Sequence, residues 1–263
     1  MKEKKSIWMV NLLIILLVLI KNAYTKEIVI RNSDKFWDNI EDIVKNNQNG
    51  EELVIFRGNK NGTIFDHNFE RSSLSFTFSA NKEEKLKFEN IIFRNYQEKN
   101  IEQGIPLISL NSYSHDFIVI FDNCEFQNNR FKVFQLSVNS QGLVTPDYHL
   151  IFNNCKFINN LKQIAFIEYK NKSFKHNIEV MKTKFINCKF ENNKGRININ
   201  YVEIEFDHCY FSGMEKDPDD SNQIAIFIQS GNANKIIFNN CIFNDINIKS
   251  NLSLINSVNL DLE

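Results

Sequence analysis

Short apolar segments with alternating polar positions recur along most of the chain. A segment such as FIVIFDNCEF (117–126) contains two short runs in which hydrophobic residues occupy every second position, and two polar residues separate the runs. A period of two is typical of β-strands that bury one face. A further apolar segment, here KVFQLSV (132–138), follows after a few polar residues. The pattern predicts a chain built from repeated short strands.

One six-residue phrase, Phe-x-x-Cys-x-Phe, marks the repeat. Its copies hold all five cysteines, which are 31, 33, 21 and 32 residues apart. An earlier copy, FENIIF (88–93), has isoleucine in place of cysteine. Self-similarity at a spacing of about 20 to 50 residues is typical of solenoids. Six units are visible, and LVIF (53–56) and TIFDHNF (63–69) predict one or two less regular ones.

The two residues inside each phrase predict a corner of the chain. Two residues cannot connect parallel strands of one sheet, and Asn-Asn or Asp-Asn is not the Asn-Gly signal of a β-hairpin. Asparagine tolerates the left-handed αL conformation, so the second strand can turn into a different sheet. One unit then completes one coil, and successive coils stack about 4.8 Å apart. The sequence therefore predicts an all-β fold, a parallel β-solenoid.

Over residues 50–250 the repeat resembles the right-handed parallel β-helix of the pectin-lyase-like superfamily. Folds of this superfamily carry a ladder of asparagine side chains at a tight bend between two strands. Amides that bond from coil to coil would satisfy groups that are costly to bury. The resemblance implies a single-stranded right-handed β-helix, with His208 in the ladder position of the fifth unit. The asparagines matched to the ladder are Asn90, Asn123, Asn154, Asn187 and Asn240.

A second, narrower resemblance lies just after the phrase. Phenylalanine and asparagine recur there as FxxN, from Phe126 to Asn129 and at the corresponding positions of the next two units, Phe157 to Asn160 and Phe190 to Asn193. This is similar to the repeats of bacterial polymorphic outer membrane proteins. Their companion GGA[ILV] motif is missing from this chain.

The first 25 residues have the three-part layout of a secretory signal peptide. A basic start, MKEKK, precedes an apolar run at 7–20, and KNAYT supplies small residues for cleavage before Lys26. The alternative is an uncleaved signal anchor, which would be the one membrane attachment, but the run is shorter than the roughly 20 residues of a spanning helix. We expect a secreted protein, extracellular or in the endomembrane lumen. Candidate glycosylation sites agree with that route: Asn61, Asn171 and Asn251.

Residues 26–50 are predicted to close one end of the solenoid. EIVI (27–30) reads as a strand, and apolar residues at helical spacing follow at 33–47. A strand and a capping α-helix would cover the open edge and core of the first coil. The coils then occupy 51–263, and the alternating segment 246–263 is predicted to form the last of them.

The cysteines are predicted to fill a structural slot. Ile91 occupies the same position in FENIIF, so the slot accepts a compact apolar side chain. Stacked, parallel cysteine side chains make disulfide geometry difficult, and a single row does not form a tetrahedral metal site. We expect a buried row of reduced thiols between stacked phenylalanines, with a disulfide as the first alternative and metal binding as the second. The row comprises Cys124, Cys155, Cys188, Cys209 and Cys241.

Candidate catalytic residues are few. The resemblance implies clustered carboxylates, or calcium with basic residues, on an outer face, yet the NTD, GHG and RIK motifs of the polygalacturonase branch are missing. Glu203 and Glu205 in YVEIEF are the best carboxylates, with Glu168 and Glu179 as candidate neighbours. Lys182 and Lys184 are placed to neutralise them, which favours a solvated charge ladder.

Cofactors and nucleic acid are not indicated. The acidic loop KDPDD (216–220) lacks the fixed ligand spacing of a known calcium loop, so we expect a surface turn and no cofactor, with calcium as the alternative. The formal net charge of −1 is typical of neither a nucleic-acid binder nor a polybasic membrane-surface protein.

The sequence favours a secreted or cell-surface protein that binds a glycan or another extracellular macromolecule, or has a structural role. The alternatives are a polysaccharide lyase or hydrolase of the pectin-lyase-like superfamily and a self-assembling protein. An enzyme should bring charged outward residues together on one sheet across three adjacent coils. A binder should show polar ladders or exposed tyrosines, for which Tyr113, Tyr148 and Tyr210 are candidates, and an assembler an uncovered terminal coil.

Overall fold

The computed structural model describes residues 25–30, 53–69, 74–78, 84–97, 104–114, 116–139, 148–169, 181–230, 235–247 and 253–258. The signal peptide (apart from Thr25), the capping helix and two of the glycosylation sites, Asn171 and Asn251, lie outside these ranges. The third, Asn61, is exposed in the turn between β2 and β3.

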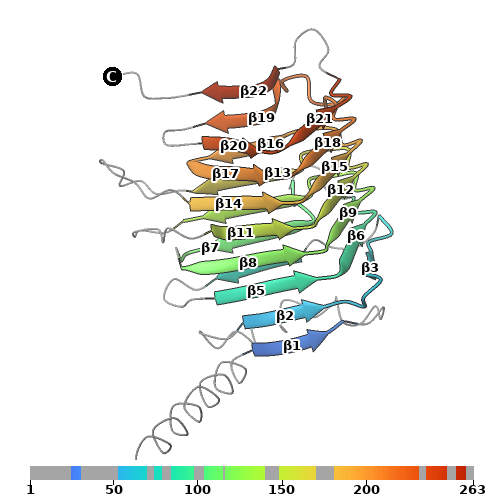
Figure 1. Cartoon of the computed structure of the whole chain (residues 1–263), viewed down its shortest axis with the longest axis vertical. Coiled ribbons are helices and arrows are strands. Elements are labelled where there is room, and N and C mark those ends of the chain that lie inside the picture. The colour runs from blue at the N-terminus through green and yellow to red at the C-terminus, as the bar shows by residue number, and fades with distance from the viewer. Residues whose placement is uncertain are drawn as a thin grey trace, which may run out of the picture.

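Three parallel sheets wind around one axis as a right-handed β-helix (Figure 1). Sheet A contains β1 (Thr25–Val29), β2 (Leu53–Arg57), β5 (Glu84–Glu89), β8 (Phe117–Asp122), β11 (Tyr148–Asn153), β14 (Met181–Ile186), β17 (Val202–Asp207) and β20 (Lys235–Asn239). Sheet B contains β3 (Thr63–Asp66), β6 (Ile91–Arg94), β9 (Glu125–Gln127), β12 (Lys156–Ile158), β15 (Lys189–Glu191), β18 (Tyr210–Ser212) and β21 (Ile242–Asn244). Sheet C contains β4 (Leu74–Phe78), β7 (Ile108–Ser112), β10 (Phe134–Val138), β13 (Ala165–Tyr169), β16 (Ile197–Asn200), β19 (Ala225–Ser230) and β22 (Ser253–Val258).

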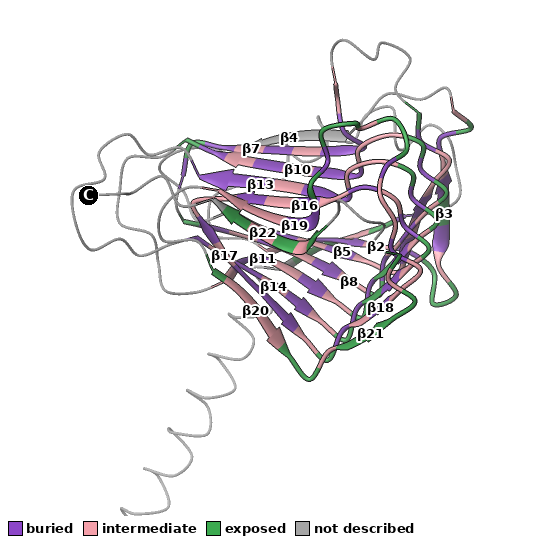
Figure 2. Cartoon of the chain, turned by 90° about the horizontal axis from the view of Figure 1, so that it is seen from above, coloured by how far each residue is buried: buried purple, intermediate pink, exposed green. Residues whose placement is uncertain are grey.

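The order of strands follows directly from the repeat. Each phrase supplies the end of a sheet A strand and the following sheet B strand, and the second apolar segment supplies the sheet C strand. Figure 2, seen from above, shows buried and partly exposed positions alternating along the strands of all three sheets. The predicted all-β class and the parallel β-helix are confirmed.

Both corners of each phrase use the left-handed conformation. At the first corner, between sheets A and B, the φ angles of Asn90, Asn123, Asn154, Asn187, His208 and Asn240 lie between 52° and 57°. At the second corner, just after sheet B, Asn95, Asn128, Asn159, Asn192 and Asp245 have φ between 49° and 58°. Asparagine and aspartate are the side chains that reach this region at least cost. The predicted turn at the phrase is confirmed.

The amide ladder lies at a different corner from the one predicted. Four of the predicted ladder asparagines are exposed and Asn90 is half-buried, because each precedes an inward-facing residue and points outward. The buried ladder is formed by Asn129, Asn160 and Asn193, each immediately after the second corner. Asn129 Nδ2 donates to Asn160 Oδ1, and Asn160 Nδ2 donates to Asn193 Oδ1, both at 2.8 Å.

The phenylalanines form two stacked columns in the core. Rings on adjacent sheet A strands, from Phe56 to Phe238, have centroids 4.6–5.2 Å apart. Rings on sheet B stack from Phe93 to Phe243 at 4.7–5.2 Å. Edge contacts, such as the 5.6 Å contact between Phe152 and Phe157, join the two columns. The predicted inward stacking is confirmed.

The cysteines share one slot beside these columns. The slot also holds Ile91, which is fully buried, and four of the five cysteines are buried while Cys241 is half-exposed. The five are free thiols, and each Sγ donates to a phenylalanine carbonyl of the preceding coil at 3.3–3.4 Å. Burial raises the pKa of Cys155 well above its usual value, and the adjacent thiols raise it further. The thiols donate to main-chain carbonyls in a slot that isoleucine also fills, so the row is structural.

Candidate functional site

The two predicted carboxylates lie on the outer face of sheet A. In the strand register Glu203 faces Lys182 and Glu205 faces Lys184, as the sequence predicted. Lys184 Nζ lies 3.0 Å from Glu205 Oε1 and 3.5 Å from Asp207 Oδ2, and Asn239 Nδ2 donates to Glu205 Oε1 at 3.0 Å. Glu168 is not a neighbour, because it lies on sheet C, and Glu179 is outside the described residues.

Tyr148 completes this group because of a local irregularity. The register between β11 and β14 shifts between Tyr148 and Leu150, which turns His149 inward and leaves Tyr148 outside. The Tyr148 hydroxyl donates a short hydrogen bond to Glu205 Oε2, and Lys184 Nζ lies 5.4 Å from the centre of the Tyr148 ring. We call the group the Glu205 cluster; it comprises Tyr148, Lys184, Glu205, Asp207 and Asn239.

The electrostatics of the Glu205 cluster hold Glu205, Lys184 and Tyr148 in their ordinary charge states at neutral pH. Burial opposes the charge of Glu205, but hydrogen bonds from Tyr148 and Lys184 outweigh it and lower the pKa below 4.5. Burial likewise opposes the charge of Lys184, but its hydrogen bond to Glu205 raises the pKa above 10.5. Burial, followed by the bond to Glu205, raises the pKa of Tyr148 to about 12. A general acid or base needs a pKa near the working pH, so the cluster is built as an ion-pair network.

Replacing Glu205 by glutamine is expected to reduce the acid sensitivity of the protein. Because the folded-state pKa of Glu205 is depressed, its ionisation stabilises the fold above about pH 4.5, and this contribution is lost as the pH falls through the folded-state value. Urea midpoints between about pH 6 and pH 3 should fall less in Glu205→Gln than in the wild type. Glu191→Gln is the control, since Glu191 forms no ion pair with a described residue, and an equal change there would contradict the prediction.

Sheet C presents an outer surface of mostly uncharged polar side chains. In β7, β10, β13 and β16 the register aligns the outward positions in two columns parallel to the axis, and no lysine or arginine occupies them. Asn111 Nδ2 donates to Ser109 Oγ at 3.4 Å, and Ser137 Oγ donates to Glu168 Oε1 at 3.1 Å. The outward side chains of these four strands are half-buried, except that of Glu168, which is 8% exposed. We call this surface the polar face; it comprises Ser109, Asn111, Gln135, Ser137, Phe166, Glu168, Asn198 and Asn200.

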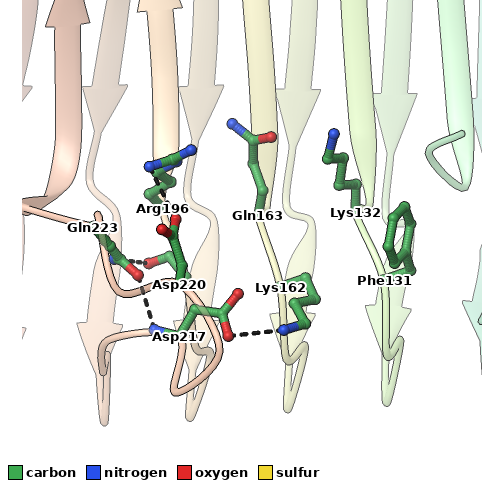
Figure 3. A pocket seen from close by; sticks show the side chains of 9 residues that line it. Phe131, Lys132, Lys162, Gln163, Arg196, Asp217, Asp220 and Gln223 are labelled. Carbon is green, nitrogen blue, oxygen red and sulfur yellow. Dashed lines mark hydrogen bonds and ion pairs between the residues drawn. The ribbon is translucent and has the colours of Figure 1, made fainter. Parts of the chain in front are cut away.

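A pocket of about 100 Å³ lies at the edge of sheet C where β10, β13 and β16 begin (Figure 3). The acidic loop KDPDD forms one wall and is held by cations from two other coils. Lys162 Nζ lies 2.9 Å from Asp217 Oδ1 and 2.6 Å from Asp219 Oδ2, and Arg196 Nη1 lies 3.0 Å from Asp220 Oδ2. The lining residues are Phe131, Lys132, Lys162, Gln163, Gly195, Arg196, Asp217, Asp220 and Gln223.

The loop is therefore a surface turn tied by ion pairs. Among the described residues no group of three or more His, Cys, Asp or Glu side chains is placed to hold a metal. Of the predicted exposed tyrosines, Tyr113 is 55% exposed, while Tyr148 and Tyr210 are half-buried.

No protein-family model, curated protein or solved structure matches the chain. In the part of the chain that the structure describes, no helix is long and apolar enough to cross a membrane.

Proposed function

We propose that the protein is a secreted β-helix of the pectin-lyase-like type that binds polysaccharide along the polar face and has no catalytic role. The observation that carries the proposal is the composition of that face. Amides and hydroxyls, in two columns along the axis, can both donate to and accept from sugar hydroxyls. Their spacing of about 4.8 Å from coil to coil suits an extended polymer lying along the solenoid.

Phe166 gives this face an apolar platform. It lies in the same column as Gln135 on one side and Asn198 on the other. A sugar ring has apolar C–H faces and polar edges, so stacking on Phe166 would bring its hydroxyls to the two flanking amides. Asn198 Oδ1 is buried and has no hydrogen-bond partner among the described residues, so a turn of the amide toward a ligand donor or a bridging water would offset the cost of its burial.

The Glu205 cluster favours the second candidate, a polysaccharide lyase or hydrolase. It brings charged outward residues together on adjacent strands of sheet A, the arrangement expected of an enzyme. Its chemistry argues against this function, because the pKa values of Glu205, Lys184 and Tyr148 all move away from neutrality. Binding without catalysis therefore agrees better with the described residues.

Phe166→Ala is expected to weaken polysaccharide binding by at least about tenfold, because stacking on a ring contributes about 1 kcal/mol or more in addition to buried area. Binding would be measured by titrating the mature protein with the polysaccharides it retains on a glycan array. Tyr210→Ala, on the outer face of sheet B, is the matched control and should bind as the wild type does. If no glycan is retained, or if both variants weaken equally, the proposed role of the polar face is wrong.

A further inference from the structure

We propose that the pocket beside KDPDD is a binding site for a tetrahedral oxyanion, such as sulfate or phosphate. Its three donor side chains come from consecutive coils: Lys132 precedes β10, Gln163 precedes β13 and Arg196 precedes β16. In Figure 3 the Gln163 amide lies between Lys132 and Arg196. An anion at Gln163 would thus have a cation on each side along the solenoid axis.

Ion pairing of the acidic loop explains only part of this pocket. It accounts for Lys162, which bonds two carboxylates, and for one of the five N–H donors of Arg196. It does not account for Gln163, whose Nε2 is buried with no hydrogen-bond partner among the described residues. Nor does it account for Lys132, whose Nζ forms no ion pair with a described residue and lies 5.9 Å from the Phe131 ring centre.

An unpartnered buried amide is costly, and an anion would remove that cost. A buried donor without an acceptor lowers the free energy of unfolding by about 1–3 kcal/mol. The last torsion of a glutamine side chain has a broad energy profile, so Nε2 can turn toward the pocket without leaving its rotamer. Hydrogen bonds from an amide and two cations to an oxyanion are of the strong, charge-assisted kind.

The two carboxylates in the wall do not exclude an anion, because both are already engaged. Asp217 Oδ1 accepts from Lys162 and from the Asp219 N–H at 2.9 Å. Asp220 accepts from Arg196 and from the Asn222 N–H at 3.1 Å. Lys162 is neutralised by Asp217 and Asp219, so the cations that remain for an anion are Lys132 and the N–H groups of Arg196 that Asp220 does not engage.

The wall is also held in place by neutral bonds. Gln223 accepts from the Asp217 N–H at 2.8 Å and donates to the Gly195 carbonyl at 3.0 Å. At Gly195 a Cβ would lie 2.6 Å from the Lys162 backbone, and φ is +99°, so only glycine allows this close approach. The pocket is thus formed before a ligand arrives, which lowers the entropic cost of binding.

Titration of the full mature protein with sodium sulfate and sodium phosphate tests the site, with sodium chloride at equal ionic strength as the salt control. In NMR spectra the resonances of the Gln163 side-chain amide should shift with added sulfate or phosphate until the site is saturated. They should not shift with chloride. Gln163→Met and Lys132→Met should each weaken binding at least tenfold. Lys189→Met, an exposed lysine on sheet B, should leave it unchanged.

A second arm identifies the source of the oxyanion, and this arm alone rests on the proposed polysaccharide function. If dextran sulfate binds more tightly than dextran, and Gln163→Met removes this difference in affinity, the pocket binds an anionic group on the polymer. If inorganic sulfate binds and the two polymers bind alike, the pocket takes a free anion. The anion site would be overturned if neither sulfate nor phosphate shows saturable binding, or if Lys189→Met loses as much affinity as Gln163→Met. Neither outcome bears on the polar face, which Phe166→Ala tests separately.

Discussion

Replacing Asn160 by alanine is expected to lower the free energy of unfolding by about 3 kcal/mol. Asn160 Oδ1 accepts from Asn129 Nδ2 at 2.8 Å, and Asn160 Nδ2 donates to Asn193 Oδ1 at 2.8 Å and to the Phe126 carbonyl at 2.9 Å. All three asparagines are fully buried, so no solvent replaces these partners. The variant leaves the Asn129 amide donor without the acceptor that offsets its burial, while Asn193 Oδ1 keeps only the bond from the Asn160 backbone N–H at 3.0 Å.

The neighbouring residue supplies a matched control. Asn159 is exposed at the αL corner, with φ of 53°, and among the described residues its side chain makes one hydrogen bond, which it donates to Asn128 Oδ1 at 3.3 Å. Asn159→Gly keeps the required backbone conformation and should cost less than about 1 kcal/mol. Urea unfolding followed by circular dichroism measures both variants. Equal losses would mean that the second corner depends on its backbone geometry and that the buried ladder adds little.

The same pair of residues shows what the sequence could and could not predict about the fold. Asparagine before an inward-facing residue indicates an αL corner, and this was predictable from FNNC alone. Which asparagine is buried depends on the direction of the side chain after the turn, and the resemblance placed the ladder at the first corner. The recurrent FxxN, with Asn129, Asn160 and Asn193 in its last position, was the signal for the second corner.

The candidate sites were predictable only where the strand register is regular. Lys182 and Lys184 face Glu203 and Glu205 because β14 and β17 pair without interruption. Tyr148 was expected on the outer surface, but its contact with Glu205 was not predictable, since the register shift at His149 decides which of two neighbours points outward. The pocket was hidden for a related reason: its donors are joined only by turns of variable length, whose geometry no periodicity encodes.

Replacing Phe152 by alanine is expected to cost about 4 kcal/mol, the largest effect of any single substitution considered for this protein. The ring lies at the centre of the sheet A column, stacked on Phe121 at 4.9 Å and on Phe185 at 4.6 Å. It also meets Phe157 edge-on at 5.6 Å. The substitution removes the transfer free energy of a fully buried ring, leaves a cavity, and breaks two stacked pairs that are each stabilising by about 0.5–1.5 kcal/mol.

The end of the parallel column provides the comparison that tests this reasoning. Phe243 stacks on Phe211 at 4.8 Å on one side alone within the described residues, and it is 36% exposed. Phe243→Ala should therefore cost about 1–2 kcal/mol, because part of the ring is already in water.

The cavity that Phe152→Ala leaves should also affect cooperativity. In a solenoid each coil contacts only its neighbours, so this central cavity weakens the coupling between the two halves of the protein. Urea unfolding of Phe152→Ala should accordingly broaden, with a smaller m-value, while that of Phe243→Ala keeps the wild-type slope. Equal losses of stability in the two variants would show that position in the column does not set the contribution of a ring.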